Sequence, residues 1–394
     1  MSGTILLRGA KQLLTLQGPA EPRRGATLQE LSIIRDGALL IEDGRIAEVG
    51  LTRRVENLVG ARECQEIDAS GRVVMPGFVD CHAHLVGGVL SPDVRIISGK
   101  RLEFLVQQYV DGMLRHGTTY LESRAGFGPD LRSSLKALKV TSKLDGAPVD
   151  IASTFLPLAS NGDESGADPR YLAWVCSTLL PAIRLKTQAV FASINAGGTA
   201  AAADCARQCI AAARDLRFQI KIEATADAGQ EAISLALESG AISVDHLGDA
   251  VPNVTDSLAR SNTMAVLLPG AAFLQSQRTS ARRFIDEGAA VALGTNFTPG
   301  AGPTFSMPAI IALACTYLEM TPQEAIHAAT YNAACALRAE RVAGSLETGK
   351  PADLIMLNVS DYREITSYFG VNLVHRTMKH GVTVYEEGKV AHCI

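Results

Sequence analysis

Several common signals are missing from this sequence, and each absence argues against a class of protein. The eight cysteines form no C-x-x-C pair, which favours reduced thiols in the core of a cytosolic protein. The formal net charge of −4 over 394 residues gives no electrostatic basis for binding nucleic acid or an anionic membrane. Apolar runs such as 310–317 are too short to span a bilayer. Residues 1–20 lack the charged start and long apolar core of a secretory signal, so we expect a cytoplasmic protein.

The composition, 47% hydrophobic and 20% charged, is typical of a globular chain with one large domain or two unequal ones. The residues before 73 are predicted to form short strands, which include a hairpin over Ala38–Val49 with its turn at Asp43-Gly44. After Val73 short apolar strands alternate with amphipathic helical segments, a pattern that favours βα units around a parallel sheet. Strand patterns return at 352–357 and 382–390.

We therefore predict an α/β fold in which a (β/α)8 barrel over residues 73–345 carries a small β-sandwich domain built from residues 1–72 and 346–394. Eight strands within roughly 230 residues suit such a barrel. A doubly wound open sheet is the alternative, but no Gly-rich phosphate turn follows the first strand. The predicted barrel strands are Val73–His84, Thr118–Glu122, Asp150–Leu156, Ala189–Ile194, Gln219–Glu223, Ser243–His246, Met264–Leu268 and Ala290–Thr295.

The end of the first predicted barrel strand carries the clearest chemical signal. His82 and His84 are two residues apart, so in a strand their side chains point to the same face. Two imidazoles that converge at the C-terminal end of a barrel strand suit the first two ligands of a divalent metal ion. The alternative is a pair of polar residues whose hydrogen bonds are satisfied by the backbone.

Other predicted strands also end in polar residues. Lys221 and Glu223 alternate with isoleucines and should face the barrel interior. They are close enough along the strand to pair with each other, which would neutralise the barrel without a metal ion. His246 follows the sixth strand and Asn296 the eighth. For His246, catalysis and a structural hydrogen bond both remain open.

The segment from Pro76 to Leu85, PGFVDCHAHL, resembles the opening signature of the metal-dependent amidohydrolase superfamily, and 349–354 resembles its return into the small β domain. Within the superfamily the chain most resembles the imidazolonepropionase family, through segments spread over nearly its whole length. These segments are 117–122, 126–128, 244–247, 265–271, 298–300, 362–364 and 368–372.

The resemblance implies a mononuclear zinc or iron site held by the histidine pair, a strand-5 histidine and a strand-8 aspartate. This sequence departs from that set, because Glu223 and Asn296 stand at the last two positions and Ala226 at the family's catalytic glutamate. The family's substrate-binding arginine and histidine have no counterpart in 86–90 and 156–160, and Phe127 replaces a tyrosine.

We expect His82, His84 and Glu223 to hold one divalent metal ion, because two histidines and a carboxylate form a legitimate three-ligand set. Zinc is the first expectation, iron and manganese are alternatives, and a metal-free site is the remaining alternative. Asn296 is predicted to be a weak ligand or to hydrogen-bond the attacking water, with His246 as base or oxyanion stabiliser. The predicted substrate-binding residues are Glu122, Arg124 and Phe127, with ion-paired rim residues as the alternative for the first two.

The leading hypothesis is a hydrolase that cleaves a C–N bond in a small cyclic amide, imide or amidine by metal-activated water. The departures predict an activity other than imidazolonepropionase itself. Two alternatives are a non-hydrolytic lyase, isomerase or cyclase on a related ring, and a catalytically degenerate member that binds a small ligand. The predicted partner is a small-molecule substrate, without nucleic acid or membrane, and the resemblance is compatible with a homodimer.

Overall fold

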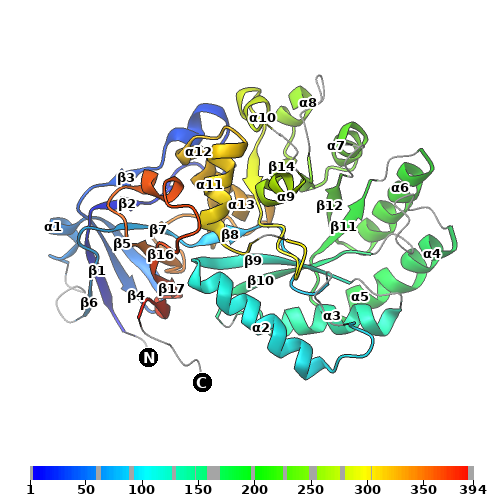
Figure 1. The fold of residues 1–394 in the computed structure, drawn as a ribbon, viewed down its shortest axis with the longest axis horizontal. Helices are drawn as coiled ribbons and strands as arrows, with labels where there is room; N and C mark the ends of the chain where they lie inside the picture. The colour runs from blue at the N-terminus through cyan, green and yellow to red at the C-terminus, as the bar shows by residue number, and fades with distance from the viewer. Residues whose placement is uncertain are drawn as a thin grey trace.

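The structure is a computed structural model that consists of a barrel beside two smaller β-sheets, which lie at the end of the molecule that carries both chain termini (Figure 1). It describes residues 3–58, 64–87, 93–126, 130–146, 148–157, 169–196, 200–224, 229–247, 255–275, 280–302 and 304–388. No helix in these ranges combines the length and the apolar character that a membrane span requires.

The barrel is one eight-stranded parallel sheet in which the strands follow one another in chain order from β8 to β15. A parallel bridge between Ala83 and Phe297, just beyond the first and last strands, joins the two edges. The predicted (β/α)8 barrel is therefore confirmed. Its strands are β8 (Phe78–Asp80), β9 (Thr118–Ala125), β10 (Asp150–Phe155), β11 (Phe191–Asn195), β12 (Gln219–Glu223), β13 (Ser243–Asp245), β14 (Met264–Leu267) and β15 (Val291–Leu293).

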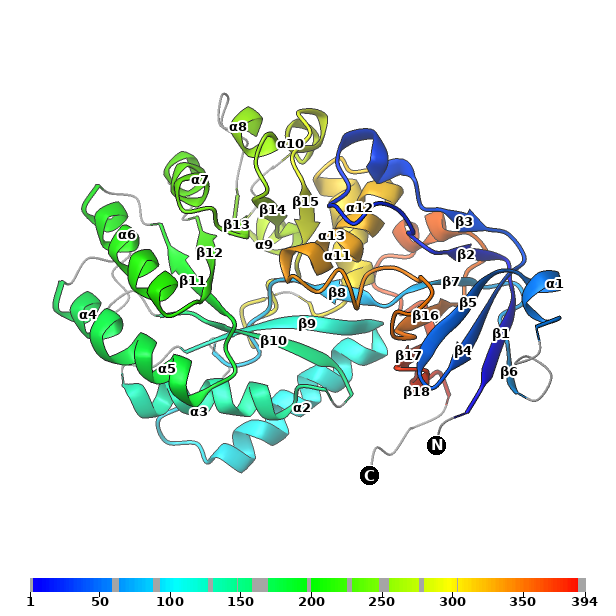
Figure 2. The same ribbon diagram turned by 180° about the vertical axis from the view of Figure 1, so that it is seen from behind.

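Helices surround this sheet, as the view from behind also shows (Figure 2). The long helix α2 is typical: its buried Leu102, Val106 and Val110 recur every four residues, and Ser98 caps its first turn by accepting from the Arg101 amide at 3.2 Å. The helices are α2 (Gly99–Arg115), α3 (Leu131–Lys143), α4 (Pro169–Trp174), α5 (Leu180–Lys186), α6 (Ala200–Asp215), α7 (Gly229–Glu238), α8 (Thr255–Ala259), α9 (Pro269–Leu274), α10 (Arg282–Asp286), α11 (Met307–Tyr317), α12 (Pro322–Ala328) and α13 (Tyr331–Ala336). A π-helical turn over Val175–Leu179 links α4 to α5.

The remaining strands form two sheets with the orders β5-β4-β1-β6 and β18-β17-β16-β7-β2-β3. Apolar side chains from both sheets, such as Leu39 and Leu354, pack into one shared core, as a sandwich requires. These strands are β1 (Ile5–Ala10), β2 (Gln12–Leu14), β3 (Ile33–Ile34), β4 (Gly37–Glu42), β5 (Arg45–Leu51), β6 (Gln65–Asp68), β7 (Val73–Pro76), β16 (Leu354–Leu357), β17 (Val374–Lys379) and β18 (Val382–Glu386), with the short helix α1 (Thr52–Val55) after β5.

The predicted strand Val73–His84 is wrong in one respect, because it is two strands in different sheets. β7 pairs with β2 and β16 in the outer sheet, whereas β8 pairs with β9 in the barrel. The chain crosses at Gly77, where a Cβ would lie 2.2 Å from the Thr119 hydroxyl oxygen, so only glycine fits there. The domain boundary at residue 73 remains a prediction.

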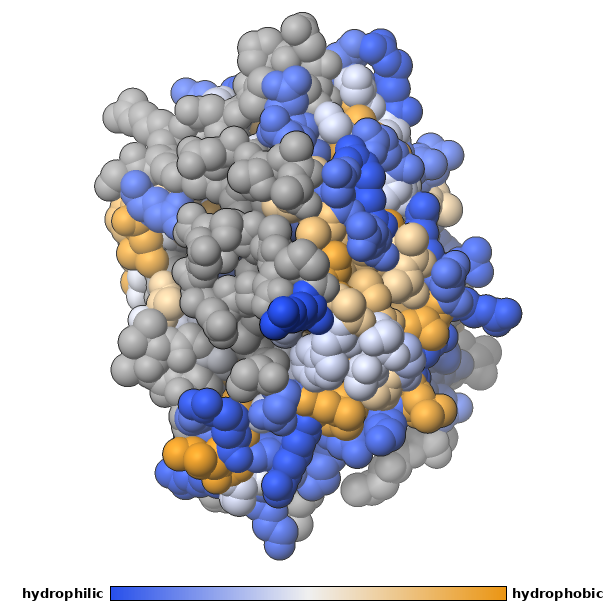
Figure 3. All heavy atoms as spheres, turned by 90° about the vertical axis from the view of Figure 1, so that its right-hand side faces the viewer, coloured by the Kyte–Doolittle hydropathy of each residue, from blue (hydrophilic) through white to orange (hydrophobic). Residues whose placement is uncertain are grey.

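The surface on the side away from the two outer sheets is mixed in character (Figure 3). Among the coloured residues in that view, hydrophobic side chains occur in small groups between hydrophilic ones. Scattered apolar residues of this kind are normal on a protein surface and indicate no particular partner.

Candidate active site

The two histidines after β8 converge, as their spacing predicts. The Nε2 atoms of His82 and His84 lie 3.3 Å apart, and both side chains are buried. The Nδ1 atom of His82 lies 2.9 Å from the Asp245 Oδ2 atom at the end of β13. This pairing assigns the Nδ1 proton to the aspartate side and leaves the Nε2 lone pair directed toward His84.

The edge between β8 and β15 fixes the position of the pair. Asp80 accepts hydrogen bonds from the amides of His82 at 3.2 Å and Thr295 at 2.9 Å, and from the Thr295 hydroxyl. Burial raises the pKa of Asp80 to about 6, against the effect of these hydrogen bonds. The Asn296 amide donates to the His82 carbonyl at 2.8 Å. Asn296 itself has a φ of +51°, a backbone conformation that asparagine tolerates better than most residues.

His246 lies beside the pair. Its ring centroid is 4.9 Å from that of His82, in an edge-to-face arrangement, and its backbone φ is +60°. The residue is partly exposed, and the charges of Glu223, Asp245 and Arg124 act on its ring. Burial lowers the pKa of His246 below its ordinary value, so the imidazole is neutral near pH 7 and could accept a proton.

Arg124, from β9, lies at the centre of a buried ion cluster. Its Nη1 atom donates to Glu223 Oε1 at 2.6 Å and to the Ser193 hydroxyl at 3.1 Å. Its Nη2 atom donates to Asp245 and, at 3.1 Å, to Glu122. Burial opposes the charge of Arg124, but the three carboxylates hold its pKa above the ordinary value.

Glu223 is the carboxylate most affected by this arrangement. Burial alone would raise its pKa, but Arg124 and the nearby imidazoles bring the pKa of Glu223 down to about 2. Its Oε1 atom also accepts a hydrogen bond from Ser193 at 3.2 Å. The suggested pairing of Glu223 with Lys221 is wrong: the Lys221 Nζ atom donates to Glu122 Oε2 at 2.8 Å instead.

The predicted substrate-binding residues lie deeper than a rim. Glu122 and Arg124 have no exposed surface and are committed to the ion cluster, where Thr154 also donates to Glu122. The alternative of ion-paired rim residues is therefore correct about the pairing and wrong about the location. Phe127 lies outside the described residues, as does Ala226, so the substrate-binding role of this set remains a prediction.

A metal ion would fit the histidine pair but not the full predicted ligand set. Two nitrogen ligands of a tetrahedral zinc ion lie about 3.4 Å apart, close to the 3.3 Å observed here. Burial lowers the pKa of His84 to about 4 and that of His82 well below its usual range, so both are neutral, as metal ligands must be. Glu223, however, is held by Arg124 and Ser193.

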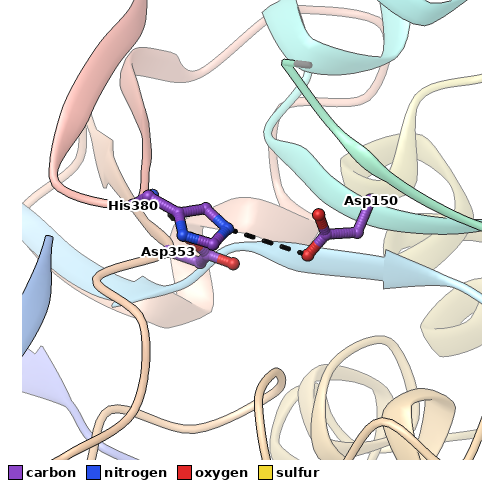
Figure 4. A group of neighbouring side chains, drawn as sticks. All are labelled: Asp150, Asp353 and His380. Atoms are coloured by element: carbon purple, nitrogen blue, oxygen red, sulfur yellow. Dashed lines mark hydrogen bonds and ion pairs between the residues drawn. The ribbon is translucent and has the colours of Figure 1, made fainter. Parts of the chain in front are cut away.

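In the ranges that the structure describes, only one group of three donor atoms lies within 4.8 Å of one another, and it is elsewhere: Asp150, Asp353 and His380 (Figure 4). The Lys379 ammonium donates to both carboxylates, at 2.6 Å for Asp150. The His380 Nε2 atom lies 3.9 Å from the Asp150 Oδ2 atom. Because a lysine already neutralises these acids, the group joins β10 to the outer sheet as an ion-pair network.

Sequence reasoning identified His82, His84, His246, Glu223 and Asn296 as site residues, and the structure brings the three histidines together. It missed the supporting residues, which are Asp80, Ser193 and Asp245. Asp245 lies between Val244 and His246, at the end of a predicted barrel strand. A polar residue at such a strand end was the signal that could have identified it.

A (β/α)8 barrel with paired histidines at the C-terminal end of its first strand defines a class of barrel hydrolases. The model of the Amidohydrolase family matches residues 73–384. The chain is 35% identical to an imidazolonepropionase from Brevibacillus brevis over 424 residues, covering 99% of this chain and 100% of the relative. It is 36% identical to an imidazolonepropionase from Geobacillus kaustophilus over 421 residues, covering 98% and 99%. The protein belongs to the amidohydrolase family, whose members are hydrolases.

Solved structures agree on the fold. An adenosine deaminase from Xanthomonas campestris with bound zinc superimposes with a TM-score of 0.72, at 17% identity, covering 96% of this chain and 92% of that chain. At this identity the likeness concerns the fold alone.

Proposed function

We propose that this protein hydrolyses a carbon–nitrogen bond, other than a peptide bond, in a small cyclic amide, imide or amidine. The observation that carries the proposal is the convergence of His82 and His84 at 3.3 Å, with the neutral His246 beside them. Membership of the amidohydrolase family and full-length relatives named imidazolonepropionase support it.

The chain's own residues supply most of the chemistry. A nitrogen of His246 takes a proton from the attacking water, the water oxygen bonds to the ring carbon, and the C–N bond breaks as His246 returns the proton to the leaving nitrogen. Asn296 is proposed to orient that water by a hydrogen bond, and Asp245 keeps the His82 tautomer fixed. Zinc, with iron or manganese as alternatives, would be held by His82 and His84, and it would lower the pKa of the water and polarise the carbonyl group.

A second candidate is imidazolonepropionase activity itself, which the names of the relatives favour. The expectation that this chain acts on another ring receives no support from those relatives, and it rests on the sequence departures alone: Glu223, Asn296, Ala226, Phe127 and the missing arginine and histidine in 86–90 and 156–160. We also propose a cytoplasmic protein with a small-molecule substrate, and a homodimer as the assembly to test.

The experiment is a substrate panel in ¹⁸O-labelled water, with imidazolone propionate, hydantoins, lactams and cyclic amidines. Hydrolysis predicts a ring-opened product with one ¹⁸O atom, detected by mass spectrometry, and loss of turnover in His246→Gln. Conversion without ¹⁸O would indicate a lyase, isomerase or cyclase instead. A folded, zinc-loaded protein that opens none of these rings would contradict the proposal.

A further inference from the structure

The ion cluster around Arg124 has an unusual charge pattern for the centre of a barrel. Two cations, Arg124 and Lys221, face three carboxylates, Glu122, Glu223 and Asp245, and their polar atoms are joined by the contacts given above. Four of these side chains are fully buried, and the Glu223 side chain is 13% exposed. Buried carboxylates without a partner would strongly destabilise the fold.

The two terminal nitrogens of the Arg124 guanidinium bind carboxylates that have different roles. Through Nη2 it holds Asp245, which orients His82. Through Nη1 it holds the Oε1 atom of Glu223 at 2.6 Å, and Ser193 shares that oxygen. Both hydrogen bonds go to the Oε1 atom, so a metal ion on the histidine pair would have to draw Glu223 away from Arg124 or bind its Oε2 atom, and in either case it would face the positive charge of Arg124.

We propose that Arg124 is an internal cation that replaces the charge compensation of a bound metal ion and withholds Glu223 from the histidine pair. The barrel then folds without metal, and it binds zinc less tightly than its donor atoms allow. This inference goes beyond the proposed reaction and does not depend on the substrate.

The test measures zinc affinity, by competition with a chromophoric chelator, and the Tm of chelator-treated protein. The wild type is expected to remain folded after chelation and to unfold cooperatively. Arg124→Gln is expected to lower the Tm of the zinc-free protein by about 5–10 °C. It is also expected to tighten zinc binding about tenfold or more, because a like charge is removed and Glu223 is released. If Arg124 had a purely structural role, its replacement would lower both the Tm and the affinity for zinc.

Arg23→Gln is the matched control. Arg23 is also buried, but it donates to backbone carbonyls, including that of Glu21 at 2.8 Å. Its loss should lower the Tm without tightening zinc binding. The double variant Arg124→Gln/Glu223→Gln removes a carboxylate together with the cation. Its Tm should therefore be higher than that of Arg124→Gln, and its zinc affinity should be lower than that of Arg124→Gln.

Three results would overturn the proposal: loss of the wild-type fold on chelation, unchanged or weaker zinc binding in Arg124→Gln, or equal tightening in Arg23→Gln. If Arg124→Gln fails to fold both with and without zinc, the double variant decides. Its folding without zinc supports charge compensation by Arg124, and its failure to fold contradicts it. None of these readouts uses enzymatic turnover, so they remain valid if the proposed reaction is wrong.

Discussion

Asp245 orients the His82 imidazole, so replacing this aspartate should weaken zinc binding by a predictable amount. The His82 Nδ1 atom lies 2.9 Å from Asp245 Oδ2, and the same oxygen accepts from Arg124. In Asp245→Asn the amide oxygen must stay on that side, because Arg124 presents only donors. The His82 tautomer is therefore preserved, and only the negative charge of the acceptor is lost.

The size of the effect follows from this geometry. Loss of an outer partner of a metal-binding histidine costs about 10- to 100-fold in metal affinity, or about 1.4–2.8 kcal/mol at 1.4 kcal/mol per tenfold change. Asp245→Asn keeps a hydrogen-bond acceptor and should lie near tenfold. Asp245→Ala removes the acceptor and frees the imidazole to turn, so it should lie near 100-fold.

The assay is a zinc competition titration near pH 7.5, where both histidines are neutral. Glu122→Gln is the matched control, because Glu122 is another buried carboxylate on Arg124 whose hydrogen bonds do not reach His82. Its zinc affinity should change by less than about threefold. Equal losses in Asp245→Asn and Glu122→Gln would show that net charge, not the orientation of His82, sets the affinity, and the reasoning would be refuted.

Three further predictions concern stability and the loop after β15. Burial lowers the pKa of His327 from 6.5 to about 4, so the wild-type protein should lose about 2 kcal/mol of unfolding free energy as the pH falls from about 7 to 5. In His327→Gln this loss should be absent, as measured by urea titration at both pH values. Lys379→Met leaves the buried Asp353 without its cation and should cost about 3–5 kcal/mol of unfolding free energy by the same method. Gly302→Ala places a Cβ 2.4 Å from the Asn296 carbonyl oxygen, and should lower kcat/KM about tenfold with zinc affinity unchanged. Unchanged values in any of these assays would contradict the corresponding prediction.

The barrel could be predicted from the sequence because each strand alternates with an amphipathic helix. β12 has the predicted bounds, Gln219–Glu223, and the other strands differ by a few residues at their ends. The apolar run 73–84 hid a change of sheet, since an apolar pattern does not reveal which neighbours a strand will have. Between α12 and α13 the chain breaks at Thr330, which has φ −135° and ψ −92°.

The site was less predictable because its contacts run between strands. Lys221 and Glu223 face the same side of one strand about 6.5–7 Å apart, which made them plausible partners in the sequence. In the barrel each of the two instead pairs with a residue of β9, Lys221 with Glu122 and Glu223 with Arg124, although β11 and β10 lie between β12 and β9 in the sheet. Pairing across the barrel interior depends on the closure of the barrel, and sequence spacing does not encode it.

The two ends of the Arg124 guanidinium lead to opposite expectations for zinc. Its contact with Asp245 supports the orientation of His82, whereas its contact with Glu223 keeps a third ligand away. Removing the Asp245 charge should therefore weaken zinc binding, and removing the Arg124 charge should tighten it, although each variant breaks the same buried ion pair. If the ion pair served stability alone, both variants would lower the Tm and neither would alter zinc affinity in a direction set by its charge.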